Sequence, residues 1–127
     1  MKYLLDTHTA IWALGNKANL SEAVKIIIDD VSLPLYVSII SAWEIAIKVS
    51  IGKLNFVGGS AFFLEKMRHN GIELLTINSS HIEPVEKLPF IHRDPFDRLL
   101  VATAKAEGMT IMTSDENIQK YDISWIW

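Results

Sequence analysis

The sequence predicts an α/β fold in which helices cover both faces of a mostly parallel sheet. Short apolar runs of about five residues alternate with longer stretches of about ten to twelve, as expected for strands alternating with helices. The chain has 127 residues, 50% of them hydrophobic and 21% charged, with no repeat and no linker. This length and composition predict one domain, residues 1–127, with one core.

Five segments are predicted as strands because they are rich in apolar and β-branched residues and lie between turn-forming residues. They are residues 3–5, 35–38, 72–77, 109–113 and 123–127, the last as an edge strand. Five helices are predicted from apolar spacing together with a capping residue or a glycine stop. They are 10–14 before Gly15, a helix begun by Ser21 and Glu22, one from a Ser41-Ala-Trp-Glu44 capping box to Gly52, one from Ser60 to Gly71, and one from Asp94-Pro95 to Gly108. Residues 79–91 are predicted as a short helix and a loop.

Composition excludes several classes of protein. Without cysteine the chain has no disulfide scaffold and no thiolate zinc site, which fits the reducing cytoplasm. The first apolar run ends at Asp6, so we expect no secretion signal, and no apolar stretch approaches the roughly 18 residues of a membrane span. The formal net charge of −3 gives no general attraction to nucleic acid, so RNA binding would need a local basic patch or a bound cation. We therefore expect a soluble cytoplasmic protein.

Four acids are predicted to gather at one edge of the sheet. Asp6 and Asp115 directly follow predicted strands, whereas Glu44 and Asp97 lie in the first turns of predicted helices. The carboxyl ends of parallel strands and the N-termini of the helices in such a fold face one rim, where α/β proteins bind their ligands. We therefore expect the four carboxylates to share one opening.

Such a cluster favours a bound cation. Two like charges about 4 Å apart repel by roughly 4 kcal/mol at an effective dielectric constant near 20, and this repulsion is expected to raise the pKa of at least one carboxyl in the metal-free protein. Mg²⁺ and Mn²⁺ prefer carboxylate and water oxygens and usually handle phosphate in such pockets. A bound ion would neutralise a phosphodiester oxygen, orient an attacking water and stabilise the departing alkoxide. The pattern indicates metal-dependent phosphodiester hydrolysis, with the four acids as metal ligands and catalytic residues.

Each acid also has a purely structural interpretation. Asp6 and Asp115 can cap the helices that follow them, and Asp97 suits the positive end of a helix dipole. Glu44 fits the third position after Ser41 in a capping box. Only the joint placement of the acids on one rim favours the functional interpretation over these local ones.

Other polar residues give weaker signals. Asp94, directly before Pro95, is interpreted as a structural cap. Four residues are candidate RNA contacts, although scattered cations are more often solvated surface: His92, Arg93, Arg98 and Lys48. Lys48 also follows Glu44 by four residues, the spacing of an ordinary helix ion pair. The four tryptophans are interpreted as core or dimer-interface residues rather than as base-stacking platforms.

Four motifs together carry a family resemblance: Leu4-Leu5-Asp6-Thr7, Ser41-Ala-Trp-Glu44, Asp94-Pro-Phe-Asp97-Arg-Leu-Leu-Val-Ala-Thr-Ala104 and Thr113-Ser-Asp115. They resemble the motifs of the PIN-domain ribonucleases, and most closely those of the small VapC-type toxins of bacterial and archaeal toxin–antitoxin pairs. The likeness runs from Asp6 to Asp115 and so covers nearly the whole chain. It preserves the order and spacing of all four acids.

The resemblance implies a three-layer α/β/α sandwich whose four acids bind one or two Mg²⁺ or Mn²⁺ ions for endonucleolytic cleavage of RNA. It also implies that Thr7, together with Thr113 or Ser114, supports the acids by hydrogen bonding. Toxins of this type usually form homodimers, and a small antitoxin encoded alongside typically blocks the site.

Two alternatives stay open at this point. One is a catalytically inactive module of the same fold that acts through a protein partner. The other is a haloacid-dehalogenase-like phosphatase, because Asp6 follows a strand; that chemistry needs a second acid two residues later, where this chain has His8.

Overall fold

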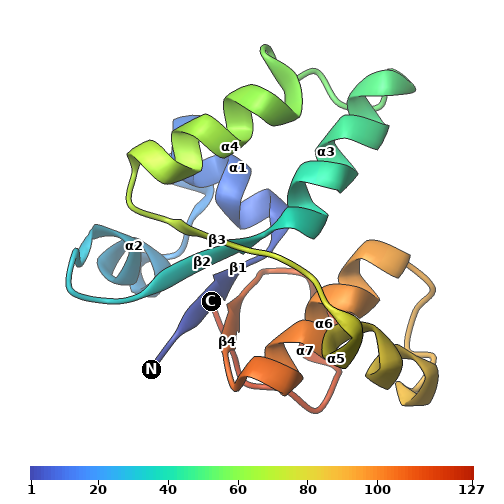
Figure 1. Ribbon diagram of the computed structural model, residues 1–127. Coiled ribbons are helices and arrows are strands. Elements are labelled where there is room, and N and C mark those ends of the chain that lie inside the picture. Colours follow the sequence, from blue (N-terminus) through green and yellow to red (C-terminus); the bar gives the residue numbers. More distant parts are fainter.

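A computed structural model describes all of residues 1–127 and contains a five-stranded sheet (Figure 1). The strands are β1 (Tyr3–Leu5), β2 (Leu35–Ser38), β3 (Glu73–Leu75), β4 (Thr110–Met112) and β5 (Trp125–Ile126). Their order in the sheet is β3-β2-β1-β4-β5, and every neighbouring pair is parallel. The predicted α/β fold with a parallel sheet is confirmed, and the last strand lies at an edge as expected.

Helices cover both faces of this sheet (Figure 1). One face carries the first four helices, α1 (Thr7–Gly15), α2 (Glu22–Asp29), α3 (Ile39–Ser50) and α4 (Gly59–His69). The other face carries α5 (Ser79–Ile82), α6 (Pro95–Glu107) and α7 (Glu116–Gln119). Short 3₁₀ helices span Lys17–Asn19 and Glu83–Lys87. None of the helices combines the length and the hydropathy that crossing a membrane requires.

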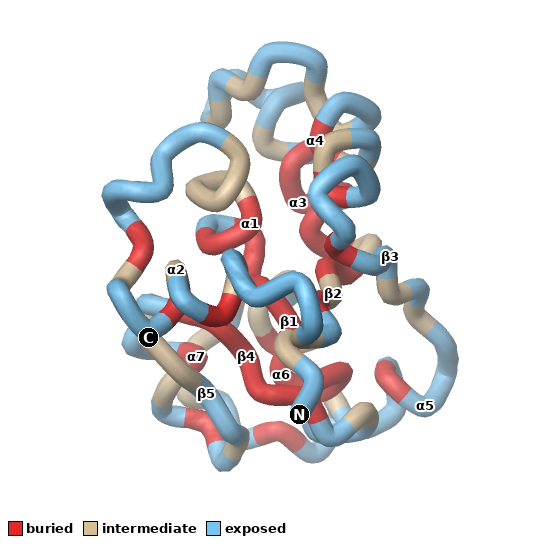
Figure 2. The backbone as a smooth tube through the Cα atoms, turned by 90° about the vertical axis from the view of Figure 1, so that its left-hand side faces the viewer, coloured by how far each residue is buried: buried red, intermediate tan, exposed pale blue.

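Two apolar clusters fill the spaces between these layers. Successive side chains of a strand point to opposite faces of the sheet, so Leu4 and Ile111 enter the cluster beneath α6, whereas Leu5 and Met112 enter the cluster beneath α1, α3 and α4. Figure 2 shows the buried backbone of the central strands enclosed by helices whose outer turns are exposed. Burial on both faces explains why the strands read as continuous apolar runs.

Three predicted helix starts are wrong by one to three residues. The first helix begins at Thr7, directly after its cap Asp6, rather than at residue 10. The third helix begins at Ile39, directly after β2, because the hydroxyl of Ser38 accepts a hydrogen bond from the Ile40 backbone N–H at 3.0 Å. Ser41 therefore lies inside the helix, and the predicted capping box is absent. The fourth helix is preceded by Gly58, whose φ of 89° is left-handed, rather than being capped by Ser60.

The strand order creates a switch point beside β1. From β1 the chain moves outward through β2 to β3, then returns to place β4 on the opposite side of β1. Connections on the two sides of such a point leave a crevice beyond the carboxyl ends of the two central strands, where ligands bind in open α/β sheets. Asp6 follows β1 and Thr113 follows β4, so both side chains lie at this crevice.

Candidate active site

Asp6 is one of the two buried acids of the site, with Glu44. It is buried at the end of β1 and also caps α1, since its Oδ1 accepts a hydrogen bond from the Thr9 backbone N–H at 2.8 Å. Its Oδ2 accepts a hydrogen bond from the hydroxyl of Thr113. Burial raises the pKa of Asp6, although the hydrogen bonds from Thr113 and Thr9 oppose that shift. The predicted capping role and the predicted position at the crevice therefore apply to the same residue.

Thr113 links Asp6 to Asp115. The Thr113 hydroxyl donates to Asp6, and its oxygen accepts the Asp115 backbone N–H at 3.0 Å. Asp115 Oδ1 caps α7 by accepting the backbone N–H groups of Asn117 at 2.8 Å and Ile118 at 3.3 Å. Its second oxygen is free of these bonds. Of the two supporting residues offered by the resemblance at this end, Thr113 makes the contact, whereas Ser114 is exposed and supports neither acid.

Glu44 enters from the second turn of α3. Its side chain is buried, and its Oε1 accepts a hydrogen bond from the Thr7 hydroxyl at 2.7 Å. The Thr7 oxygen also lies 2.9 Å from the Ser41 hydroxyl, so Ser41 supports the acid indirectly. Glu44 Oε2 pairs with Lys48 one turn later, and this hydrogen bond raises the pKa of Lys48. The predicted helix ion pair and the predicted supporting role of Thr7 are both present, whereas the capping-box interpretation of Glu44 is wrong.

Asp97 lies in the first turn of α6. Asp94 caps this helix as predicted, accepting the backbone N–H groups of Phe96 at 2.9 Å and Asp97 at 3.1 Å. Oδ2 of Asp97 lies within hydrogen-bond distance of His92 Nε2, 3.0 Å away. Burial is the main cause that raises the pKa of Asp97 to about 7, and the charges of Asp94 and two other acids of the site add to it.

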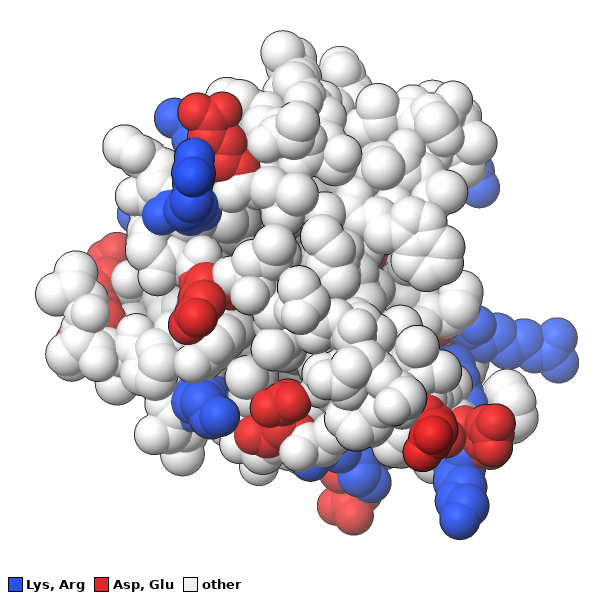
Figure 3. Space-filling view, in the orientation of Figure 1, with Lys and Arg blue, Asp and Glu red and all other residues white.

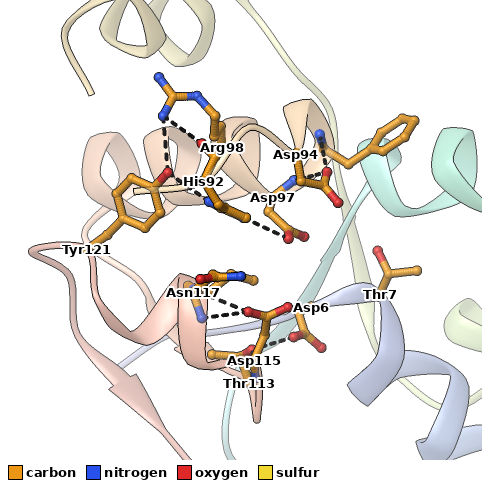
Figure 4. Close-up of polar contacts among 12 residues, drawn as sticks. Asp6, Thr7, His92, Asp94, Asp97, Arg98, Thr113, Asp115, Asn117 and Tyr121 are labelled. Carbon is orange, nitrogen blue, oxygen red and sulfur yellow. Dashed lines mark hydrogen bonds and ion pairs between the residues drawn. The ribbon is translucent and has the colours of Figure 1, made fainter. Parts of the chain in front are cut away.

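Asp97 lies near the other three acids. Figure 4 shows Asp97 pointing from α6 toward Asp6 and Asp115 across the crevice. The charges of Asp115 and Glu44 both raise the pKa of Asp97, which places these acids of three different elements near one another. The sequence predicts a raised carboxyl pKa in the metal-free protein from repulsion alone. For Asp97 burial is the largest cause of the raised pKa, the hydrogen bond with His92 opposes it, and repulsion from Asp94, Asp115 and Glu44 adds to it.

The donor set fits a hard divalent cation. All the converging groups are oxygens, and a positive charge there would offset both the burial of Asp6 and the repulsion around Asp97. However, no three His, Asp or Glu side chains lie close enough together to hold one ion between them in this arrangement. Binding an ion therefore requires the carboxylates to turn further toward the space that they share.

The candidate RNA contacts differ in their surroundings. Arg98 is 5% exposed, and its guanidinium donates to backbone carbonyls and to Tyr121, so its predicted contact with RNA is wrong. His92 is bonded at both ring nitrogens, and Lys48 is paired with Glu44. Arg93 is exposed beside the site. The predicted role of Arg98 fails because burial of a charged side chain depends on tertiary packing, which no local pattern records.

Sequence reasoning missed two residues of the site. Tyr121 is buried and contacts both His92 and Arg98, although nothing near it in the sequence marks it. The sequence predicts Ser41 as a helix cap, and that prediction gives no indication of its contact with Thr7. The signal for Ser41 was its spacing of three residues before Glu44, which places both side chains on one face of a helix.

The fold and the site define a class: an α/β protein with a parallel sheet and a cluster of acids at its switch point. The family model of the PIN domain matches residues 3–124, and the chain belongs to this family. A comparison with curated proteins finds no match.

Solved structures share the fold over nearly the whole chain. A chain of VapBC2 from Rickettsia felis, solved with a promoter DNA fragment, is 17% identical, with a TM-score of 0.73 and coverage of 100% of this chain and 99% of that chain. For VapBC from Salmonella typhimurium, solved with DNA, the values are 16%, 0.72, 99% and 97%. For VapBC-1 from nontypeable Haemophilus influenzae they are 22%, 0.67, 99% and 97%. At these identities the likeness establishes a shared fold, the three-layer α/β/α sandwich.

Proposed function

We propose that this protein is a Mg²⁺- or Mn²⁺-dependent endoribonuclease and the toxin of a toxin–antitoxin pair. One observation supports the proposal most: burial and the charges of nearby acids, Asp115 and Glu44 among them, raise the pKa of Asp97 to about 7, and Asp97 points across the crevice toward Asp6 (Figure 4). PIN domains are generally nucleases, and the chain belongs to that family. The four acids proposed as ligands and catalytic residues are Asp6, Glu44, Asp97 and Asp115.

The chain's own residues prepare the site for phosphate chemistry. A bound Mg²⁺ or Mn²⁺ ion would neutralise a phosphodiester oxygen and lower the pKa of an attacking water. Thr113 and the Thr9 backbone hold Asp6 in one orientation, and Thr7 does the same for Glu44. Asp97 carries a proton in a large share of metal-free molecules near pH 7, and a cation would displace that proton.

We propose that a bound divalent cation supplies much of the electrostatic attraction between the protein and RNA. The net charge is −3, and Figure 3 shows basic and acidic side chains interspersed on one face without a continuous basic patch. Lys48 is paired with Glu44, which leaves exposed Arg93 as the better candidate for a phosphate contact near the site. Affinity for RNA should therefore fall when the divalent ion is removed, beyond the usual effect of salt.

A protein partner and a homodimer are also proposed. The similar solved structures are VapBC and FitAB assemblies, which favours a cognate antitoxin for this chain. Trp43 and Ile47 are exposed on one face of α3, and Ile51, the residue that follows the helix, continues the spacing of four and is also exposed. Exposed apolar patches of this kind often mark protein interfaces, which supports self-association through α3.

The test is cleavage of a labelled RNA by purified protein with Mn²⁺ or Mg²⁺. We expect the wild type to cleave, Asp6→Asn to lose at least a hundredfold in rate, and EDTA to stop the reaction. Asp122→Asn is the matched control, since Asp122 is exposed and lies beside the C-terminal end of α6, whereas Asp97 lies in its first turn. Equal rates for the wild type and Asp6→Asn would contradict the catalytic assignment.

An inactive binding module of the same fold is the second candidate. It is favoured by the pairing of Glu44 with Lys48 and by the lack of three ligand-type side chains close enough to hold an ion. Titration of the metal-free protein with Mn²⁺ in a calorimeter separates the two candidates. Binding that Asp6→Asn abolishes supports the nuclease, and no binding by the wild type supports the module.

A further inference from the structure

A chain of buried polar groups stands behind Asp97 (Figure 4). Arg98 Nη1 lies 3.1 Å from the hydroxyl of Tyr121, that hydroxyl lies 2.9 Å from His92 Nδ1, and His92 Nε2 lies 3.0 Å from Asp97 Oδ2. Asp97 and Arg98 are neighbours in α6, where successive side chains point about 100° apart around the helix axis. The helix therefore directs Asp97 to the crevice and Arg98 to the packed side, and Tyr121 and His92 connect their side chains.

The chemistry of the guanidinium group fixes the direction of every hydrogen bond that Arg98 makes. A guanidinium has donors and no acceptor, and the buried Arg98 donates to the backbone carbonyls of Pro89 at 2.8 Å and Leu88 at 3.3 Å, as well as to the Tyr121 oxygen. Because these carbonyls hold the guanidinium in place, its contact with Tyr121 has a fixed position. The Tyr121 oxygen is therefore an acceptor from Arg98, and its own hydrogen must go elsewhere.

The direction of the remaining bonds follows. The free partner for the Tyr121 hydrogen is His92 Nδ1, which accepts it only if that nitrogen carries no proton. A neutral imidazole with a bare Nδ1 carries its proton on Nε2, and Nε2 then donates to Asp97 Oδ2. This arrangement satisfies every buried polar atom, in agreement with the absence of any unpaired buried side-chain polar atom.

We propose that Arg98, Tyr121 and His92 form a positioning relay that selects the Nε2–H tautomer of His92 and thereby fixes the orientation of the Asp97 carboxylate. Oδ2 is held by His92, while Oδ1 accepts no hydrogen bond and is left for the crevice. A ligand whose orientation is set by an outer hydrogen bond binds metal more tightly than a freely rotating one. The role of the relay in metal binding rests on the proposed function. The tautomer of His92 follows from the hydrogen bonds alone and does not depend on that function.

The first test reads the tautomer directly. In ¹⁵N NMR spectra recorded above the pH at which the ring shifts stop changing, His92 should show Nε2–H in the wild type and a mixture with Nδ1–H in Tyr121→Phe. His81 is an internal control, because its Nδ1 accepts the Asn78 backbone N–H at 3.1 Å and its tautomer should stay constant. An Nδ1–H signal for His92 in the wild type, or identical His92 signals in both proteins, would overturn the relay.

The second test measures Mn²⁺ affinity by calorimetry, independently of RNA cleavage. Tyr121→Phe should raise the dissociation constant by about tenfold, and Tyr36→Phe, on β2 and outside the relay, should leave it unchanged. His92→Gln, whose side-chain amide can donate to Asp97, should retain more affinity than His92→Ala. Circular dichroism establishes that each variant folds.

The outcomes separate the relay from the proposed function. Unchanged affinity in Tyr121→Phe, or equal losses in His92→Gln and His92→Ala, overturns the positioning role. Failure of the wild type to bind Mn²⁺ overturns the proposed function, and the His92 tautomer then decides by itself whether the relay exists.

Discussion

At the scale of single residues, one carboxylate can both cap a helix and face the crevice. Asp115 uses Oδ1 for the N-terminus of α7 and keeps Oδ2 free, and Asp6 accepts the Thr9 N–H at one oxygen and the Thr113 hydroxyl at the other. A helix N-terminus favours acids and faces the crevice at the same time. For Asp6 and Asp115 the structural and the functional interpretations are therefore not exclusive, and a capping role does not argue against a role as a metal ligand.

Asp97 should make the stability of the metal-free protein depend on pH. Its pKa is about 7 when folded and 3.8 in its ordinary state, so between these values the folded chain holds a proton that the unfolded chain has released. Stability therefore falls as the pH rises from about 4 to about 7. In EDTA, urea unfolding should show that Asp97→Asn lacks this part of the decline and is more stable than the wild type at pH 8 by a few kcal/mol at most.

The control for Asp97 is an exposed acid. The stability of Asp122→Asn, whose substitution is at an exposed position, should change between pH 4 and pH 8 as that of the wild type does. If Asp97→Asn declines between pH 4 and pH 8 as steeply as the wild type, the raised pKa of Asp97 is wrong.

Thr113 should matter for stability more than its size suggests. Thr113→Val removes the hydroxyl that donates to the buried Asp6, which leaves a carboxylate oxygen without its partner and costs about 1–3 kcal/mol of unfolding free energy. Thr103→Val is the matched control, because the Thr103 hydroxyl is also buried but bonds only the Leu99 carbonyl within α6. Denaturant unfolding at pH 7 compares the two, and equal losses would show that the Asp6 contact contributes nothing particular.

At the scale of elements, local signals place some boundaries and miss others. The helix α6 begins and ends where Asp94-Pro95 and Gly108 predict, because a cap, a proline and a left-handed glycine all act locally. The start of α3 was misplaced because two serines could cap it, and Ser38 is the one at which the strand ends. The choice between Ser38 and Ser41 depends on where β2 pairs with β1, which is a tertiary fact.

Asp94 allows the cap of α6 to be separated from its charge. Asp94→Ala removes the acceptor for two backbone N–H groups and should cost about 1 kcal/mol. Asp94→Asn keeps an acceptor, so stability should be nearly unchanged while the pKa of Asp97 falls, since the charge of Asp94 contributes to raising it. Thermal unfolding and NMR titration of Asp97 measure the two effects, and an unchanged Asp97 pKa in Asp94→Asn would contradict the electrostatic coupling.

The turn before α4 depends on Gly58. Its φ is 89°, and an added Cβ would lie 2.5 Å from the Cβ of Phe62, so Gly58→Ala should destabilise the protein by about 1–3 kcal/mol. Gly15→Ala, at the end of α1 with open space around it, is the control and should be neutral or slightly stabilising. Urea midpoints of the two variants decide the matter; similar midpoints would mean that the turn relaxes freely.

At the scale of the whole molecule, the sequence predicts at which edge of the sheet the candidate site lies, but it does not predict the hydrogen bonds within the site. The convergence of Asp6 and Asp115 follows from parallel strands, whose carboxyl ends share one edge. The contacts of Tyr121 join positions 23 and 29 residues apart, and that of Thr113 with Asp6 spans 107. Such pairs leave no periodic trace in one sequence. Arg98 was misassigned for the same reason, because its burial is decided by the segment that covers it.

Divalent ions should stabilise the whole fold through the four acids. A ligand that binds only the folded state adds about 2.7 kcal/mol at a concentration of 100 times its dissociation constant, equivalent to a rise in Tm on the order of 10 °C for a chain of this size. Scanning calorimetry with Mn²⁺ should show this rise for the wild type and for Asp122→Asn, and little of it for Asp97→Asn. Sodium chloride of equal ionic strength controls for screening.

Comparing the stability of the wild type with that of Asp97→Asn, with and without Mn²⁺, also tests why the chain has an acidic cluster. Without metal at pH 8, Asp97→Asn should be the more stable protein, because Asp97 is partly buried and lies among like charges. With saturating Mn²⁺ the order should reverse, since only the wild type gains the binding energy. Groups that are kept at a cost to stability mark function rather than folding. If Asp97→Asn stays more stable at every Mn²⁺ concentration, the cluster does not serve a cation.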